Sequence, residues 1–326
     1  MVRYRKIIAY VFLTSVFSGC TDEISVFTPG PSIPVVYGVL DIRDTIHYLK
    51  LSKTFGGYDD PAILASDPEN IFFQDAIVYL RPVGVLRKIM FESIQGQARD
   101  SGYFPPLPNL SYQSNAKLKE GRYDLVIIIP ETADTLTTRF VLMDSFWILN
   151  PRPGFRKFYF YEDPIPFTWN KAALVGLYEI AFSLTYQEVL IKGDTLTRVY
   201  CHRERIIPES LEQSDYLFNY YYYSDPFFAD MQHKIKKDPM VNFRKPIDLS
   251  FSITAIDTTL ARYLDWYNLI TDDKINPNGN IPGAIGVIGS KETIHYKNLT
   301  LSPVSQDSLT RGRYTRHLGF VINWDW

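Results

Sequence analysis

Cysteine is nearly absent from this chain of 326 residues, which contains only Cys20 and Cys201. Two cysteines allow at most one disulfide, and none if Cys20 is modified as its context below predicts. Stability must then come from the burial of apolar side chains. Cys201 precedes His202, but neighbouring side chains of a strand point to opposite faces and cannot easily act as nucleophile and base. We interpret Cys201 as a structural residue.

The chain also lacks an excess of basic residues. It has 34 Lys and Arg against 36 Asp and Glu, and its formal net charge is −2. No basic run or stripe is present that could neutralise several phosphates of a nucleic acid. Beyond the N-terminus, no apolar run approaches the roughly 20 residues of a transmembrane helix. Nucleic acid is therefore not an expected partner.

Reactive motifs are equally scarce. The five histidines are scattered, without the HxxxH or HExxH spacing that places two zinc ligands on one helix face. The segment 272–279 resembles a calcium loop, but Lys274 and Ile285 would occupy its first and last ligand positions. Glycines recur every third residue over 283–289, which indicates a bent or bulged strand and not a phosphate loop. No GxSxG elbow is present. The sequence predicts no catalytic residues, no metal site and no cofactor.

The N-terminus carries an export signal. Residues 3–6 are positively charged, and 7–17 are apolar but too short to span a bilayer. Two small residues then precede Cys20, as in a bacterial lipobox, although Phe17 stands where leucine is usual. The pattern, whose charged residues are Arg3, Arg5 and Lys6, predicts a signal peptide over 1–19 and a lipid on Cys20, which would hold the protein on a membrane. An ordinary secretory signal or a short membrane anchor is the alternative.

A short tether is expected over residues 20–31. Its acidic residues 21–23 resemble the surface-export signals of Bacteroidota lipoproteins, whereas a plain solvated linker is the alternative. We expect the protein at the outer membrane, on the cell surface, with the periplasmic face as the other possibility.

Aromatic residues make up 15% of the chain, a bias that favours strands over helices. Short β-segments separated by polar turns predict an immunoglobulin-like or transthyretin-like β-sandwich over 32–145. The strands expected there are 33–40, 45–53, 75–80 and 123–129.

A proline-rich passage then separates a second β-rich domain, expected over 155–326. Alternating apolar residues predict a long hairpin over 177–207. The hydrophobic period changes twice, and these changes predict short helices near 226–237 and 258–270. Asp257 is suited to cap the second helix.

Several segments resemble one known group in their residues and their order. They are 34–40, 45–48, 74–80, 118–125, 178–186, 238–241 and 285–289. The set is similar to an uncharacterised family of Bacteroidota outer-membrane lipoproteins, known only as a domain of unknown function. The resemblance implies a β-sandwich followed by a second β-rich region, and it brings no catalytic residues. It also implies an association with outer-membrane transporters.

Aromatic side chains form the candidate binding surface. The candidates are Tyr103, Phe104, Trp169, Tyr220, Tyr221, Tyr222 and Tyr223. Exposed rings can stack on a sugar or pack against a protein partner. The alternative is structural, because a strand over 220–223 would bury every second ring.

The sequence thus predicts a lipid-anchored, non-catalytic protein that serves as a binding or accessory component, for example of an outer-membrane transporter. A surface glycan-binding protein is the alternative, and exposed Trp or Tyr platforms would support it. A hydrolase assembled from distant residues is a third hypothesis, which would need a deep pocket with converging carboxylates or a Ser-His pair.

Overall fold

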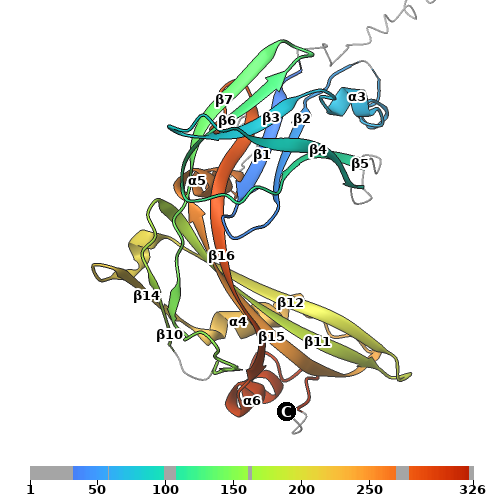
Figure 1. Ribbon diagram of the computed structural model, residues 1–326. Helices are drawn as coiled ribbons and strands as arrows, with labels where there is room; N and C mark the ends of the chain where they lie inside the picture. The colour runs from blue at the N-terminus through green and yellow to red at the C-terminus, as the bar shows by residue number, and fades with distance from the viewer. Residues whose placement is uncertain (1–31, 58, 99–107, 161–163, 269–278, 323–326) are drawn as a thin grey trace, which may run out of the picture.

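The computed structural model describes residues 32–57, 59–98, 108–160, 164–268 and 279–322. It is mainly β, with 51% strand and 15% helix, so the predicted β-rich fold is confirmed. Figure 1 shows two β regions connected by one long strand, β16 (Ile285–Leu301), which runs through both.

The N-terminal region contains seven strands and two one-turn helices. They are β1 (Pro34–Leu40), β2 (His47–Lys53), α2 (Pro61–Leu64), α3 (Pro68–Ile71), β3 (Ile77–Pro82), β4 (Ile89–Ala98), β5 (Pro108–Ser114), β6 (Gly121–Ile129) and β7 (Asp134–Leu142). The start of β4 pairs with β3 and its later part with β5, so the sheet turns back over an apolar core. Val36, Leu80, Ile127 and Phe140 meet in that core.

The C-terminal region contains long strands and three helices. Its elements are β8 (Ile148–Asn150), β9 (Lys157–Phe158), β10 (Ile165–Asn170), β11 (Val175–Leu190), β12 (Thr195–Ile206), η1 (Pro208–Ser210), β13 (Glu212–Gln213), β14 (Leu217–Tyr222), α4 (Ser224–Lys234), β15 (Val241–Asp257), α5 (Thr258–Asn268), β16 and α6 (Pro303–Arg311). The predicted hairpin is confirmed, because β11 and β12 pair along most of their length.

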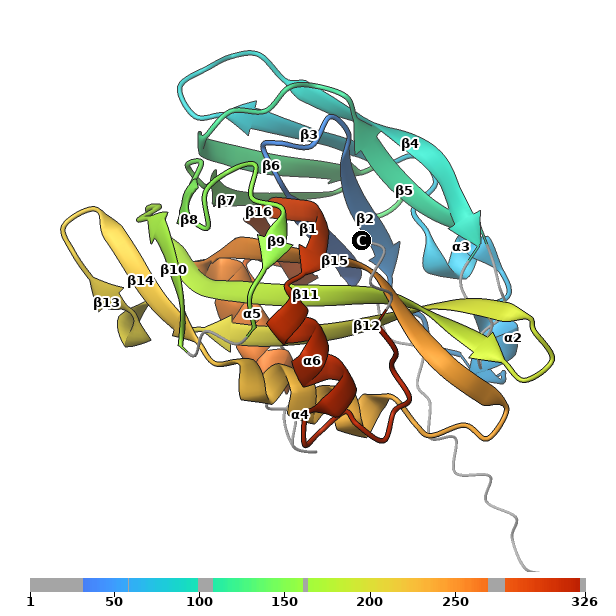
Figure 2. The same cartoon turned by 90° about the horizontal axis from the view of Figure 1, so that it is seen from below.

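An aromatic core fills the space between the β12-β11-β15-β16 sheet and the smaller β13-β14-β10-β8 sheet. Four rings at its centre have centroids about 5 to 6.5 Å apart and pack in tilted or edge-to-face pairs. They are Phe158, Phe167, Phe182 and Phe251. Helices α4 and α6 both add side chains to this core, Phe227 and Met231 from α4 and Leu309 from α6. Figure 2 shows α6 crossing in front of the long strands, with α4 near its end.

Both predicted helices are present. Helix α4 begins at Ser224, earlier than predicted, and Asp225 lies inside its first turn. Asp257 caps α5 as predicted, accepting hydrogen bonds from the N–H groups of Thr259 at 2.7 Å and Leu260 at 3.1 Å. Helix α6 was not predicted, although its cap, Ser302, and the proline after it form a recognisable start signal.

Strand β16 belongs to both β regions. Residues 285–290 pair in parallel with β1, and residues 291–299 pair in antiparallel fashion with β15. Ile288 of β16 is fully buried in the core of the N-terminal region. The domain limits at 145 and 155 remain a prediction. Sheet hydrogen bonds connect the two sides of these limits, because β1 lies before them and β16 lies after them.

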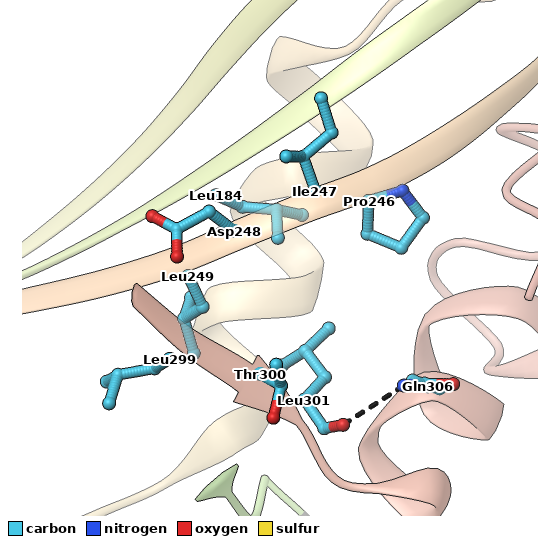
Figure 3. Close-up of a pocket in the computed structure, with 9 residues that line it drawn as sticks. All are labelled: Leu184, Pro246, Ile247, Asp248, Leu249, Leu299, Thr300, Leu301 and Gln306. Atoms are coloured by element: carbon cyan, nitrogen blue, oxygen red, sulfur yellow. Dashed lines mark hydrogen bonds between the residues drawn. The ribbon is translucent and has the colours of Figure 1, made fainter. Parts of the chain in front are cut away.

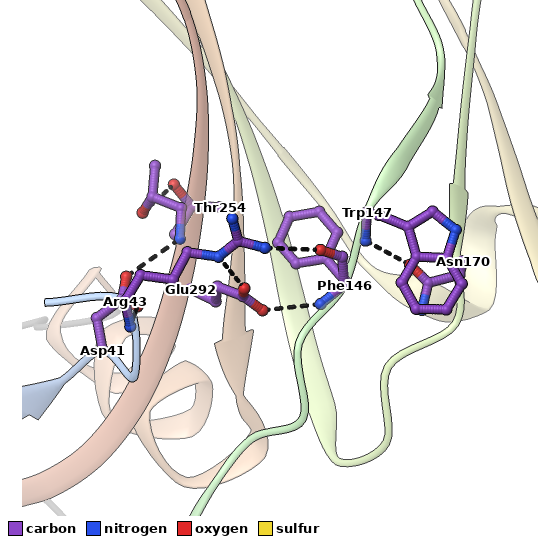
Figure 4. Close-up of polar contacts among 8 residues, drawn as sticks. Asp41, Arg43, Phe146, Trp147, Asn170, Thr254 and Glu292 are labelled. Carbon is purple, nitrogen blue, oxygen red and sulfur yellow. Dashed lines mark hydrogen bonds and ion pairs between the residues drawn. The ribbon is translucent and has the colours of Figure 1, made fainter. Parts of the chain in front are cut away.

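Buried polar contacts reinforce this junction. The Glu292 carboxylate, 2% exposed, pairs with Arg43 from the β1–β2 turn and accepts a hydrogen bond from the Phe146 N–H at 2.8 Å. Asp41 in the same turn accepts from the Thr293 N–H at 3.2 Å. Figure 4 shows these groups converging on β16 from both sides. The N-terminal turn is thereby fixed to the C-terminal sheet.

Candidate binding site

A pocket of about 700 Å³ lies where β1 and α5 meet the C-terminal sheet. Four strands provide its floor, namely β11, β12, β15 and β16, and the side chains of Tyr37 and Leu264 stand at its edge. The period of two along a strand explains the arrangement. Phe182 and its alternate neighbours face the aromatic core, so Ala181 and Ser183 face the pocket.

Small hydroxyl side chains cover much of the floor. Ser183, Ser250, Ser252, Thr254 and Thr293 all line the pocket and are half-buried. The Thr254 and Thr293 hydroxyls lie 3.1 Å apart across the β15–β16 pair. Each hydroxyl can donate one hydrogen bond and accept two, so the floor suits a polar ligand with several hydrogen-bonding groups.

The charged residues of the pocket are mostly basic. Lys291, His295 and Lys297 alternate along β16, and Arg203 extends from β12. Glu179 is the carboxylate among the lining residues, and it lies 3.9 Å from Arg203 and 3.7 Å from Arg205.

This environment lowers the pKa of His295 and so favours its neutral form. Burial is the main cause that lowers its pKa, and the positive charges of Lys297 and Lys291 lower it further. The neutral imidazole can therefore accept or donate a hydrogen bond at neutral pH. Ser252 lies opposite His295 in the strand pairing, but no hydrogen bond between these two described side chains is present.

The tyrosine run alternates between core and solvent. Tyr222 is fully buried against Phe182, whereas Tyr221 and Tyr223 are 42% and 56% exposed. Tyr220 is half-buried and its hydroxyl donates to the Glu204 carboxylate. Along this run, Tyr222 is thus directed into the core, Tyr220 is half-buried, and Tyr221 and Tyr223 are exposed.

Two of the predicted surface residues require correction. Trp169 and Tyr222 have no exposed side chain, so neither can form part of a binding surface. The reason is the pairing of β10 with β14, which directs both rings into the core beneath the smaller sheet. Tyr103 and Phe104 lie outside the described residues.

Cys201 and His202 lie on opposite faces of β12, as predicted. Cys201 lines the pocket, and the His202 ring nitrogen Nδ1 lies 3.1 Å from the carboxylate of Asp230 on α4. Asp230 also accepts from the Tyr200 hydroxyl and pairs with Lys234, both at 2.8 Å. Burial acts to raise the pKa of Asp230, but these partners lower it overall. We interpret this cluster as the attachment of α4 to the sheet.

A second cavity is much smaller. Figure 3 shows it between β15 and the end of β16, next to Pro246 and Leu301. Its volume is about 10 Å³, which is room for about one water molecule. It forms near the register shift between Leu249 and Phe251, where the two strands separate. A volume of this size leaves no room for a small-molecule ligand.

The pocket could not be located from the sequence, because its floor combines strands that are up to 118 positions apart, from Glu179 to Lys297. Seryl, threonyl and lysyl side chains on alternate positions are also ordinary for a solvated sheet face. The one signal was the polar alternation Lys291, Thr293, His295 and Lys297, which marks a single face of one strand.

Within the described ranges, no group of three or more His, Cys, Asp or Glu side chains could hold a metal ion. The calcium-like loop lies outside those ranges except for Gly279. Of the helices that the structure describes, none has the length and apolar character needed to cross a membrane. No protein-family model matches the chain, and a search of curated proteins finds no match.

Proposed function

We propose that this protein is a non-catalytic binding protein, anchored to the outer membrane by a lipid on Cys20, that holds a polar ligand in the pocket beside β16. The pocket of about 700 Å³, floored by hydroxyl and basic side chains, is the observation that carries the proposal. Ligand sites are usually the largest preformed concave surfaces of a protein. The buried junction around Glu292 supports such a preformed site, because it fixes the β1–β2 turn to β16 beside the pocket.

The anchor and the location come from the sequence. The apolar stretch 7–17 followed by Cys20 supports lipidation, and the resemblance to Bacteroidota lipoproteins supports the outer membrane. In this setting the protein would present its pocket to ligands near the membrane, as an accessory component of a transporter does.

Catalysis is less well supported by the same pocket. Hydrolysis by paired carboxylates needs two facing acids, but Glu179 is engaged by two arginines. A serine nucleophile needs a hydrogen-bonded base, and His295 makes no such contact with Ser252 among the described residues. We therefore propose binding as the function.

The experiment is recovery of bound molecules from the native membrane. The acylated, full-length protein is purified in mild detergent, and co-purifying proteins and small molecules are quantified by mass spectrometry. A Ser252→Trp variant fills the pocket with a bulky ring from its half-buried floor. Thr137→Trp on the exposed face of β7 places the same ring elsewhere and serves as the control.

A stoichiometric ligand that is retained by the wild type and by Thr137→Trp, but lost from Ser252→Trp, is the expected result. Equal recovery from all three proteins would place binding elsewhere. Recovery of every protein without a ligand would contradict the proposed function.

A further inference from the structure

Two lysines face the pocket without an opposing carboxylate. Lys291 and Lys297 lie on the exposed side of β16 and line the pocket, and neither forms an ion pair with any described residue. Glu179 is occupied by Arg203 and Arg205. The pocket therefore has an excess of positive charge over a partly desolvated floor, where an anion would be attracted more strongly than in open water.

The spacing of the charges suits an extended ligand. Lys291 and Lys297 are six residues apart on one strand, and at about 3.3 Å per residue their Cα atoms are separated by roughly 20 Å. Thr293 and His295 lie between them on the same face. A ligand along β16 would thus meet a cation at each end and neutral hydrogen-bonding groups in the middle.

A tyrosine ring borders the same pocket. Tyr37 of β1 lines it and is 41% exposed, and its ring centroid lies 6.4 Å from that of Tyr263 on α5. An exposed tyrosine ring offers an apolar face and a polar tip. Such a ring can stack on the apolar face of a sugar while hydroxyl side chains bind the sugar's own hydroxyls.

We propose that the pocket binds an acidic saccharide. Lys291 and Lys297 hold its anionic groups, Ser252 and Thr293 bind its hydroxyls, and Tyr37 packs against a sugar ring. This inference rests on the proposed function and adds the class of ligand to it. A hydroxyl-rich floor distinguishes a saccharide from an acidic peptide, whose backbone and carboxylates offer fewer hydroxyl partners.

The experiment is calorimetric titration of the acylated, full-length protein in detergent. The acidic probes are an oligogalacturonate, which carries carboxylates, and a sulfated heparin-derived oligosaccharide. The neutral probe is a galacto-oligosaccharide of the same length, and oligoglutamate tests charge without sugar. The test variant is Lys291→Gln with Lys297→Gln. Its control is Lys192→Gln with Lys237→Gln, which removes two exposed lysines outside the pocket.

We expect at least one acidic saccharide to bind at least tenfold more tightly than the neutral saccharide and oligoglutamate. The Lys291 and Lys297 variant should lose at least tenfold in affinity, and Tyr37→Ala severalfold, while the control variant retains wild-type affinity. Affinity should also fall as salt is raised, because the lysines are exposed. Circular dichroism confirms that each variant is folded.

Three results would overturn the inference. If the neutral saccharide bound as tightly as the acidic one, charge would not determine binding. If oligoglutamate bound as tightly as the acidic saccharide, the sugar would not be recognised. No binding of either acidic saccharide would reject the ligand class. In each case, a native ligand that Ser252→Trp loses would leave the proposed function standing, and its absence would reject both.

Discussion

Individual residues at the junction are polar yet buried, and this makes them sensitive to substitution and to pH. Asp257, Glu292 and His47 are each less than 10% exposed. The cap formed by Asp257 could be predicted from its position before an amphipathic segment. The burial of Glu292 and His47 could not, because it depends on strands brought together by the fold.

We predict that the buried His47 lowers the free energy of unfolding of the protein in acid. Burial lowers its pKa, and the Asp44 carboxylate offsets this only in part. As the pH falls through the unfolded value of about 6.5, the unfolded chain binds a proton and the folded chain does not, so the folded state is destabilised. The decrease can reach about 1.4 kcal/mol per pH unit for one group. Urea unfolding between pH 7.5 and 5.5 measures it.

His47→Asn should show a smaller decrease over the same interval, because the titrating group is gone. His295, whose pKa is also lowered, acts in the same direction and remains in both proteins. Equal pH slopes for wild type and His47→Asn would contradict the assignment.

Glu292→Ala should lower the free energy of unfolding by about 1–3 kcal/mol, because the buried Phe146 N–H loses its acceptor. Asp307→Ala removes an exposed carboxylate that pairs with Arg311 on α6 at 3.2 Å, and it should cost less than about 1 kcal/mol. Thermal or urea denaturation gives both values. A similar small loss for the two variants would mean that the junction contact contributes little.

At the scale of elements, local signals predicted strands β1, β2, β3, β6, β11 and β12 and both helices α4 and α5, but not β4, β5 or β7. The hairpin of β11 and β12 could be predicted because apolar residues alternate with polar ones over many positions of β11. The pairing of β1 with β16 was not, since the partners are about 250 residues apart and parallel strands carry no turn signal. Of the glycines at 283–289, Gly286 and Gly289 lie in β16, whereas Gly283 lies in the turn before it at φ +78°.

Gly286 lies where the backbones of β1 and β16 approach closely, so its substitution tests this packing. Its φ is +112°, and an added Cβ would lie 1.9 Å from the Val36 carbonyl oxygen. Gly286→Ala must therefore strain the backbone and push the strands apart, and we expect a loss of at least about 2 kcal/mol in the free energy of unfolding. Gly193→Ala, at φ +93° in an open hairpin turn, should lose less because its Cβ meets no atom within 4 Å. If both variants lost equal stability in urea unfolding, the close approach would be refuted.

At the scale of the whole molecule, the shared strand β16 leads us to predict that the two β regions unfold as one cooperative unit. Cleavage of the sheet at β16 would expose the cores on both sides. All five tryptophans follow residue 146, so their fluorescence reports on the C-terminal region, while far-ultraviolet circular dichroism reports on the whole chain. We predict coincident urea transitions by the two methods. Separate midpoints would show that the regions unfold independently.

The pocket forms only when the whole chain is folded, because its lining residues come from several strands and a helix. The sequence directed attention to the tyrosine run on β14, where Tyr221 and Tyr223 remain exposed. The fold instead gathers hydroxyl and basic groups from four strands and borders them with β1 and α5. Which of these two surfaces is occupied decides between the pocket and the aromatic patch as the functional site.

Chemical footprinting of the protein in its native membrane decides this most directly. Lysine acylation and tyrosine iodination are quantified by mass spectrometry in native membranes and after purification and washing. We predict that Lys291 and Lys297 are severalfold less reactive in the membrane, while Lys192, Lys237, Tyr221 and Tyr223 are unchanged. Equal reactivity of all four lysines, with protection of Tyr221 and Tyr223 instead, would contradict the pocket as the binding site.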